Sequence, residues 1–484
     1  QRIRNGDENS LSMLNDWIDD WIKSNPPYFG PNWKCGQEAS IRVMHLFCAS
    51  MILGQEHQPM PALQNLIILH LRRIAPTLAY AIAQDNNHGT SEAAALFIGG
   101  AWLSSLGLKE AVNWEKTGRK FLEDRAEKLI SSDGSFSQHS LNYHRLLLDT
   151  FSTVEIARKK LDVIPLSEKF YKKTALATSW LYQMILPTNG DGPNIGANDG
   201  ARLIPLTNTS YRDYRPSVHL AMALFNNCQG YKGKGPWSDH LLWLDIEEKL
   251  KLPLDFVDCD YNNGGYKILR QGNVNVFFNF PKFLFRPSQA DALHLDLWIN
   301  EKNMLLDAGS YCYNLESLDM SNYFSGTKSH NTVEFDGRDQ MPKISRFLFG
   351  GWLKSYNIKQ ILTHKGKKCC SVGYTDYKGA MHNREISLRK DNLCVVDTLN
   401  NFNKKAILRW RLGNGNWRLK VINRRVIVSN GLHKLTVTSD VKIARNNLLE
   451  GWMSLYYLHK KKIQTLEIEI NKAGKLTTLY EWDL

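Results

Sequence analysis

Apolar residues recur every three to four positions through the first half of the chain, from about residue 37 to residue 250. That spacing lines one face of a helix with apolar side chains, so the pattern predicts an all-helical half. The expected helices cover residues 37–53, 63–84, 91–106, 114–131, 140–161, 167–186, 216–228 and 238–250. Thr90 or Ser91 can cap the third helix, and Gly107 can end it. Helical hairpins that repeat without strands predict a bundle, a solenoid or a toroid of helices.

After Pro253 the pattern changes to short segments in which apolar and polar residues alternate, separated by Gly and Asn turns. A period of two predicts antiparallel strands, expected at residues 275–280, 332–335, 394–398, 406–412, 421–428 and 465–470. The change falls in the polar segment 250–262, which is rich in Asp and Asn. We therefore predict a helical domain over residues 1–252 and a β domain over residues 253–484.

One expected strand has candidate functional side chains on one face. In residues 293–298 the leucines share one face, and His294, Asp296 and Trp298 share the other. The leucine face is expected to be the buried one, so His294 is expected on the outer face, where it could look into a cleft against the helical domain. An outer-face histidine without a chemical role stays the alternative.

Composition narrows the class of protein. A chain of 484 residues exceeds what one hydrophobic core usually supports, which also favours two domains. Lys and Arg number 61 against 48 Asp and Glu, and this excess of 13 favours a negatively charged partner, either nucleic acid or an acidic glycan. The 14 Trp and 19 Tyr residues serve as core volume or as flat platforms for sugars.

Other classes lack their signatures. The eight Cys residues show neither a CxxC pair nor the density of a disulfide scaffold, so buried thiols are expected. No apolar run approaches the length of about 18 residues that a membrane span needs, so no membrane contact is expected. GxSxG, P-loop, HExxH and Rossmann motifs are absent, and nothing selects a pair of glycosidase carboxylates. The sequence opens without a signal peptide; a chain that starts at Gln1 is a candidate processed product, and the compartment stays open.

Two polar clusters in the helical half are candidates for chemistry. Residues 85–89, including Asn87 and His88, precede an expected helix whose free N–H groups favour an anion. Residues 138–145 bring Tyr143, His144 and Arg145 together, and a cation beside a phenol lowers its pKa. The alternatives are a polar loop for the first cluster and packing residues for the second.

A third region lies in the β half, where histidines and aspartates on adjacent strands could bind a divalent metal such as zinc. It contains Arg286, Asp291, His294, Asp307 and His330. No pair of these residues has the spacing of a metal-binding motif.

The order of these motifs along the chain resembles the heparinase II/III-like polysaccharide lyases. It runs Asn-Asn-His at 86–88, Ser-x-x-Tyr-His at 140–144, Ala-Asp-Ala-Leu at 290–293, Leu-Asp-Ala-Gly-Ser-Tyr at 306–311 and Ser-His-Asn-Thr-Val at 329–333. Further matching pieces lie at 33–38 with Arg42, at 198–200 and at 336–340. The resemblance implies an α+β multidomain protein, with an incomplete (α/α) toroid followed by an antiparallel β-sandwich. It also implies β-elimination at a uronic acid.

The resemblance implies catalytic roles for Asn87 and His88 on the substrate carboxylate, and for Tyr143 in proton transfer at C5 or at the leaving oxygen. The family places a His before the Ala-Asp pair, where this chain has Gln289. That departure moves the role of the sandwich histidine to His294 or His330. It also weakens the inference that a metal site of the family is present at Gln289, Asp307 and His330. No cofactor is therefore expected, and a structural divalent metal in the sandwich stays the alternative.

Substrate contacts are expected from residues of both halves: Trp33, Gln37, Glu38, Arg42, Asn86, His139, His144, Arg202, Arg286, Gln289 and Tyr313. Arginine suits this task because its fork bonds two oxygens of a carboxylate or sulfate at once. The expected partner is an acidic polysaccharide rather than nucleic acid. The expected location of the protein is the periplasm or the outside of the cell, with the cytoplasm as the alternative. A uronate C5-epimerase and a non-catalytic acidic-glycan-binding protein are the competing functions.

Overall fold

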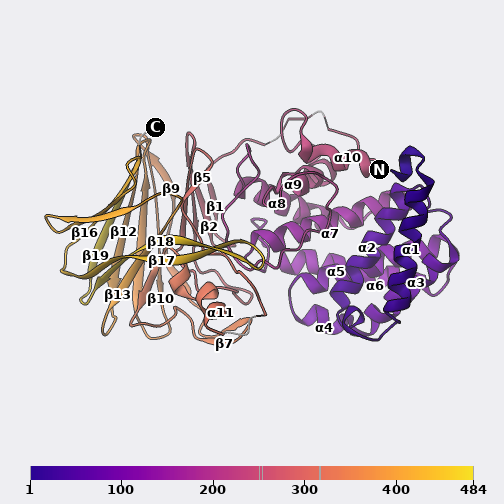
Figure 1. The fold of residues 1–484 in the computed structure, drawn as a ribbon, viewed down its shortest axis with the longest axis horizontal. Coiled ribbons are helices and arrows are strands. Elements are labelled where there is room, and N and C mark those ends of the chain that lie inside the picture. The colour runs from indigo at the N-terminus through magenta and orange to yellow at the C-terminus, as the bar shows by residue number, and fades with distance from the viewer. Residues whose placement is uncertain (1, 250, 253, 315–317, 483–484) are drawn as a thin grey trace.

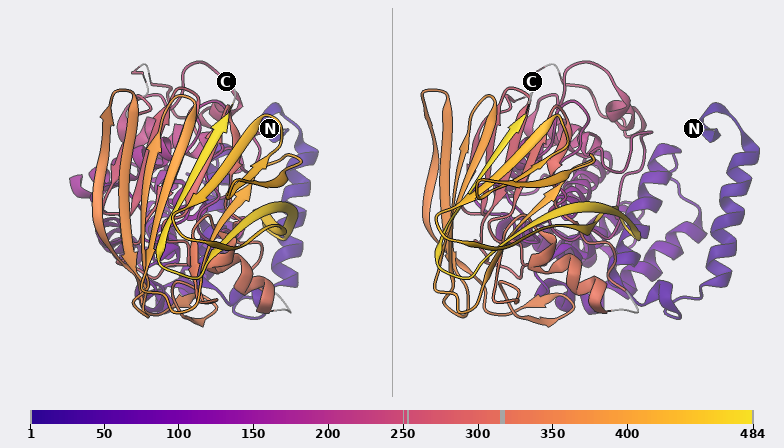
Figure 2. Two further views of the ribbon diagram at one scale, coloured as in Figure 1. Left: turned by 90° about the vertical axis from the view of Figure 1, so that its left-hand side faces the viewer. Right: turned by 60° about the vertical axis from the view of Figure 1, so that its left-hand side comes forward.

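A helical body and a β body lie side by side in the computed structural model, which describes residues 2–249, 251–252, 254–314 and 318–482 (Figures 1 and 2). The helices of the first body are α1 (Glu8–Ser24), α2 (Gly36–Ile52), α3 (Pro61–Ile74), α4 (Leu78–Ala83), α5 (Asn87–Ser105), α6 (Ala111–Leu129), α7 (Leu141–Lys160), α8 (Glu168–Met184), α9 (Arg215–Ala221) and α10 (Asp239–Trp243). They pack as antiparallel neighbours in the toroid-like arrangement that was predicted.

Helix boundaries follow the apolar pattern closely, with a few differences; one is that α9 ends at Ala221 rather than at residue 228. The amphipathic helix α1 was not predicted, and α10 ends at Trp243, short of the predicted residue 250. Helix α5 begins at Asn87 with Asn86 as its N-cap, rather than at Thr90 or Ser91. The first helical turn therefore contains Asn87 and His88 themselves. Ser140 caps α7 by accepting a hydrogen bond from the Tyr143 N–H.

The strands of the β body form two large antiparallel sheets and one separate two-stranded pair. They are β1 (Cys259–Tyr261), β2 (Tyr266–Gln271), β3 (Val274–Asn279), β4 (Leu295–Ile299), β5 (Lys302–Leu305), β6 (Val333–Phe335), β7 (Lys343–Ser345), β8 (Leu348–Phe349), β9 (Lys354–His364), β10 (Lys367–Thr375), β11 (Met381–Leu388), β12 (Asn392–Asn400), β13 (Ala406–Leu412), β14 (Arg418–Ile422), β15 (Arg425–Ser429), β16 (His433–Ser439), β17 (Ile443–Tyr456), β18 (His459–Ile470) and β19 (Gly474–Trp482). A short helix, α11 (Leu318–Ser325), lies between β5 and β6.

One sheet has the order β1-β2-β3-β4-β5-β13-β18-β17, with β6 also paired to β13. The other has the order β14-β15-β16-β19-β12-β11-β10-β9. The single strand predicted at 421–428 is instead the hairpin β14–β15, because Asn423 and Arg424 adopt left-handed backbone conformations that reverse the chain. Apolar side chains from both sheets share one core, which confirms the predicted sandwich.

The first sheet also packs against the helical body, so both of its faces are covered around β2 to β4. The core of the helices continues onto Tyr266, Phe277 and Trp298 of these strands, and the Trp180 and Tyr266 rings lie 5.2 Å apart. The last helix of the helical body, α10, ends at Trp243, and β1 begins at Cys259, so the predicted boundary lies between them.

Helices α3 and α4 form one helical run, Pro61–Ala83, that by length and composition alone could cross a membrane. The run contains Arg72 and Arg73 in its middle. Its Ile67 and Leu71 side chains are buried in the core of the helical body. This position is that of a core helix in a folded domain.

Candidate active site between the two domains

Three side chains from both domains meet where the helical body faces the sandwich. Tyr143 lies in the first turn of α7, Asp199 in the loop after α8, and Tyr313 in the loop after β5. The Tyr143 hydroxyl lies 3.0 Å from Asp199 Oδ2 and 3.1 Å from the Tyr313 hydroxyl. Tyr143 keeps 8% of its surface exposed, so it lies at the edge of the interface and is not sealed inside.

Counting protons fixes the direction of these bonds. A carboxylate oxygen only accepts, so the single Tyr143 proton goes to Asp199 and the Tyr313 hydroxyl donates to Tyr143. Burial, followed by the charges of Tyr313 and Asp199, holds the pKa of Tyr143 well above 10. Tyr143 is therefore a neutral phenol whose proton points at a carboxylate.

The cation expected beside Tyr143 is directed elsewhere, and this prediction was wrong. Arg145 donates to the Tyr211 carbonyl (2.6 Å) and to Asn142 Oδ1 (2.7 Å), and its guanidinium stacks on the Tyr211 ring. Its role is indirect: it holds Asn142, whose amide donates to Asp199 Oδ1 at 3.1 Å. Arg145 thus supports the carboxylate rather than the phenol.

The N-terminus of α5 forms a second wall of this site. Asn87 keeps 5% of its surface exposed, and its N–H donates to Gln138 Oε1 at 2.8 Å, which ties α5 to the loop before α7. Burial lowers the pKa of His88, Arg286 of the sandwich lowers it further, and Asp199 opposes both. His88 is therefore neutral near pH 7 and lies in the electrostatic reach of Arg286, which is exposed.

Several helical residues that were predicted to contact substrate have other surroundings in the structure. Trp33 is 2% exposed and packs on His70 at 4.5 Å. Arg42 donates to His70 and to the Asn32 carbonyl. The amide of Gln37 is buried, and Glu38 is exposed on α2. Trp33 and Arg42 therefore offer no platform for a sugar, because the ring and the guanidinium pack inside the helical body.

Three further predicted contacts serve structure. His144 stacks on Trp180 at 4.5 Å in the helical core, because it points away from Tyr143 on α7. Arg202 donates to Thr207 and Thr209 of its own loop. The Asn86 side chain caps α5 by accepting from the His88 N–H.

Two others lie at the domain interface. His139, with its pKa lowered to about 4 by burial, meets Phe283 of the sandwich edge to face at 5.5 Å. Gln289 accepts from the Gly196 N–H (2.9 Å) and donates to the Gly309 carbonyl (3.1 Å), so it joins the loops that carry Asp199 and Tyr313.

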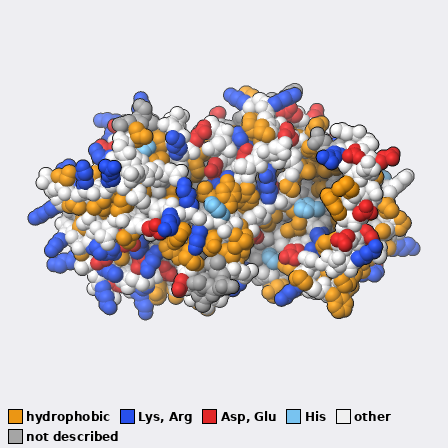
Figure 3. Space-filling view, in the orientation of Figure 1, with side chains coloured by type: hydrophobic (Ala, Val, Ile, Leu, Met, Phe, Trp, Pro, Cys, Tyr) orange, Lys and Arg blue, Asp and Glu red, His pale blue; other side chains and the backbone are white. Residues whose placement is uncertain are grey.

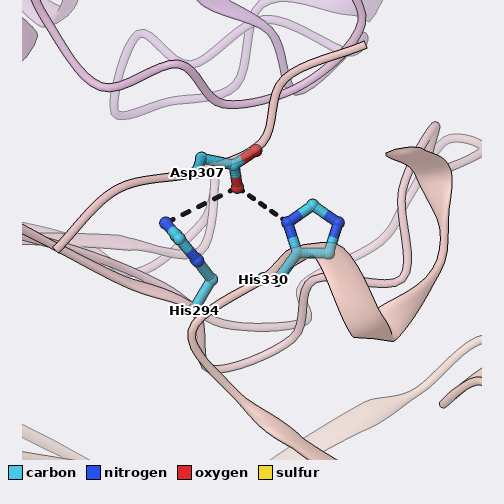
Figure 4. Close-up of side chains that lie close together, drawn as sticks. All are labelled: His294, Asp307 and His330. Carbon is cyan, nitrogen blue, oxygen red and sulfur yellow. Dashed lines mark hydrogen bonds and ion pairs between the residues drawn. The ribbon is translucent and has the colours of Figure 1, made fainter. Parts of the chain in front are cut away.

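The two sandwich histidines meet at Asp307, as Figure 4 shows. His330 Nδ1 lies 2.7 Å from Asp307 Oδ2, and His294 Nε2 lies 3.5 Å from the same oxygen. Burial alone would lower the pKa of His330, but Asp307 outweighs it and raises that pKa. His294 is 1% exposed and His330 is fully buried, so the prediction that His294 looks into a cleft was wrong. The strand face was correct, but the helical body covers it.

These three side chains offer the donor types of a zinc site, with one ligand atom each within 4.8 Å of the others. His294 Nδ1, however, accepts the Asn331 backbone N–H at 2.9 Å, so Nε2 is the nitrogen that donates, to Asp296 Oδ2 at 3.3 Å. A metal needs a lone pair at that nitrogen. The arrangement therefore fits a buried network, in which His330 bonds to Asp307 and His294 to Asp296, better than a metal centre. Because Asp307 Oδ1 also accepts the Gly309 N–H at 2.7 Å, the network anchors the loop that leads to Tyr313.

Sequence reasoning missed the role of Asp199. It appeared there only as part of a matching stretch, and its distance of 56 residues from Tyr143 gave no local sign of contact. Tyr457 was also missed: it lies near the tip of the β17–β18 hairpin, and its hydroxyl accepts the Tyr313 N–H at 3.3 Å. Each contact joins segments that are far apart in the sequence but belong to one domain, Asp199 with Tyr143 in the helical domain and Tyr457 with Tyr313 in the sandwich.

Known proteins resemble this chain along nearly its whole length. The model for the heparinase II/III N-terminus matches residues 5–213, and the model described as heparinase II/III-like, C-terminal, matches residues 258–482. Heparin-sulfate lyases of Bacteroides stercoris and Bacteroides thetaiotaomicron are 20% identical over 437 residues and 21% identical over 369 residues, covering 82% and 70% of this chain. The chain spans about half of their length, 56% and 50%. A crystal structure of heparinase III superposes with a TM-score of 0.71 at 17% identity, covering 99% of this chain and 74% of that one, and shows the same fold.

Proposed function

Because the chain belongs to the heparinase II/III family, we propose that it is a polysaccharide lyase that cleaves a uronic-acid-containing acidic polysaccharide by β-elimination. The observation that carries this proposal is the hydrogen-bonded chain from Tyr313 through Tyr143 to Asp199, which joins the two domains beside Asn87 and His88. The relatives named as heparin-sulfate lyases favour a glycosaminoglycan as the substrate class.

The substrate carboxylate has to be neutralised before its neighbouring C5 proton can leave, because the carbanion would otherwise add a second negative charge. Asn87 supplies an amide donor and His88 a neutral imidazole donor at the N-terminus of α5, where the helix dipole also favours an anion. Arg286 supplies the positive charge from the sandwich side. The carboxylate is thus held between the two domains.

Tyr143 transfers the protons. As a neutral phenol it can take the C5 proton only if its own proton moves to Asp199 at the same time. The C5–H and C4–O4 bonds break, the C4=C5 double bond forms, and Tyr143 gives a proton to the leaving O4 as Asp199 returns its own. The net result moves one proton from C5 to O4, and the enzyme is regenerated.

A panel of uronate-containing polysaccharides tests the reaction and the substrate class together. The wild type is expected to release a product with the ultraviolet absorbance of an unsaturated uronate, and Tyr143→Phe to lower that rate by roughly a hundred- to ten-thousand-fold with the fold intact by circular dichroism. Deuterium incorporation at C5 without cleavage would indicate an epimerase instead. Binding without turnover of any polymer would indicate a glycan-binding protein.

A further inference from the structure

A small pocket opens beside Tyr313, on the sandwich side of the proposed active site. Its wall includes Tyr313, Ser288, Ser310, Lys343, Arg346 and Phe347. Lys343 begins β7, which lies with α11 at the lower edge of the sandwich, toward the helical body (Figure 1). The pocket is therefore next to the reacting centre, but it is separate from the wall formed by Asn87 and His88.

Two cations line this pocket without a carboxylate partner among the described residues. Lys343 Nζ donates to Asn322 Oδ1 (3.1 Å) and Ser325 Oγ (2.8 Å), both neutral, and no described residue takes its third hydrogen. Arg346 donates to Asn314 Oδ1 (2.5 Å), and its other N–H groups have no hydrogen-bond partner in the part of the chain that the structure describes. Burial lowers the pKa of Lys343, Asp339 opposes this, and Arg346 lowers it further, so the two cations repel each other.

Like charges held side by side are stabilised when an anion sits between them. The pocket volume of about 40 Å³ accommodates a group of a few atoms but not a sugar ring. Beside it the Phe347 ring is 48% exposed and stands edge to face against Tyr313 at 5.3 Å. A sugar ring can therefore lie against Phe347 while a small anionic substituent enters the pocket.

We propose that the Lys343/Arg346 pocket is a subsite for an anionic oxygen group, a sulfate or a carboxylate, on the sugar next to the one that reacts. The inference rests on the proposed function, because it takes Tyr143 and Tyr313 to mark the reacting sugar. It assigns substrate selection to charges in the sandwich, whereas carboxylate neutralisation belongs largely to the helical body.

Calorimetric titration of the Tyr143→Phe protein, which holds the substrate without turnover, tests the subsite. The ligands are oligosaccharides of equal length from unsulfated heparosan, from heparan sulfate and from carboxyl-reduced heparosan. Lys343→Ala/Arg346→Ala is expected to weaken binding of the sulfated ligand by roughly 10- to 100-fold, because charge-assisted hydrogen bonds are lost. A loss confined to the sulfated ligand identifies sulfate as the occupant, and a loss for both acidic ligands but not the reduced one identifies the carboxylate.

Arg418→Ala/Lys420→Ala is the matched control, since it removes two exposed cations from β14 at the far edge of the other sheet. It is expected to change each affinity by less than about three-fold. The subsite would be overturned by an equal loss of affinity for all three ligands or by no loss of affinity. It would also be overturned if no ligand bound to the Tyr143→Phe parent protein. Turnover of the wild type is measured separately, so binding without cleavage contradicts the proposed function and leaves the subsite standing.

Discussion

At the scale of single residues, Asp199 is the group whose chemistry the geometry constrains most. Asp199→Asn keeps the shape but cannot take the proton that Tyr143 must give up. We expect kcat to fall by roughly a hundred-fold or more, with KM changed only a few-fold, since the substrate carboxylate is bound by other residues. Initial rates of unsaturated product formation measure both constants.

Tyr457→Phe is the control for that substitution. It removes a hydroxyl from the same cleft, but one that contacts Tyr313 only through the backbone N–H and lies outside the chain to Asp199. Its kcat should stay within a few-fold of wild type. Comparable losses in the two variants would show that any change of polarity in this cleft inactivates the protein, and the relay through Asp199 would be refuted.

Glu92 supplies a prediction about stability. Burial raises its pKa to about 7, whereas Arg73 lowers it slightly, so the folded protein binds a proton that the unfolded chain, with an ordinary pKa of 4.5, releases earlier. The contribution of Glu92 to the stability of the folded protein should therefore be lost as the pH rises from about 4.5 to about 7. The loss is on the order of 3 kcal/mol at most, and it is complete above pH 7.

Glu92→Gln keeps the shape and removes the titration. We expect urea unfolding to show that the free energy of unfolding of the variant, relative to that of the wild type, is higher at about pH 8 than at about pH 5. All other titrating groups are common to both proteins, so the difference reports Glu92 alone. A stability difference that is the same at the two pH values would contradict the raised pKa.

Residue spacing explains which neighbours in the sequence become neighbours in space. Tyr143 and Arg145 are two positions apart on α7, which places them on nearly opposite sides of the helix. The sequence therefore predicted a candidate site at Tyr143 but gave Tyr143 the wrong partner. Asp199 takes that place instead, from a loop whose path follows from tertiary contacts that no local pattern contains.

At the scale of elements, apolar periodicity predicted most helices and some of the strands, because burial of one face determines both. It failed where burial is weak: α1 has no buried residue, and in β14 most side chains are exposed. His294 shows the limit of a strand pattern. Alternation identified its face correctly, but only the docking of the helical body decides whether that face is open.

The loops that meet at the active site are joined by one side chain, Gln289, which lies between Gly196 and Gly309. Gln289→Leu keeps the volume and leaves a buried N–H and a buried carbonyl without partners. We expect a loss of about 1–3 kcal/mol in the free energy of unfolding and a several-fold lower kcat, because Asp199 and Tyr313 lie on the two loops. Urea denaturation and initial rates measure the two effects.

Gln360→Leu is the comparison for that experiment, because Gln360 is exposed on β9. This variant should match the wild type within about 0.5 kcal/mol. If Gln289→Leu behaved in the same way, the hydrogen bonds between the loops would contribute nothing to closure of the domains.

At the scale of the whole molecule, the positive charge lies in the sandwich. Residues 253–484 contain 34 Lys and Arg against 22 Asp and Glu, whereas residues 1–252 contain 27 against 26. Lys and Arg side chains accordingly project from the sandwich end of the face shown in Figure 3. The charge surplus that the sequence revealed thus belongs to the domain that carries Arg286 and the Lys343/Arg346 pocket.

This asymmetry predicts how turnover depends on salt. A polyanion approaching the sandwich is attracted over a distance set by the Debye length, which shortens as salt is added, so association slows. The proton transfers occur between partly buried groups that salt screens much less. We therefore expect kcat/KM to fall roughly ten-fold between about 0.05 M and about 0.5 M salt while kcat at saturating substrate changes less than two-fold. Initial rates over a range of substrate concentrations at each salt level separate the two constants. A fall in kcat equal to the fall in kcat/KM would place the salt effect on the chemical step and contradict steering by the sandwich.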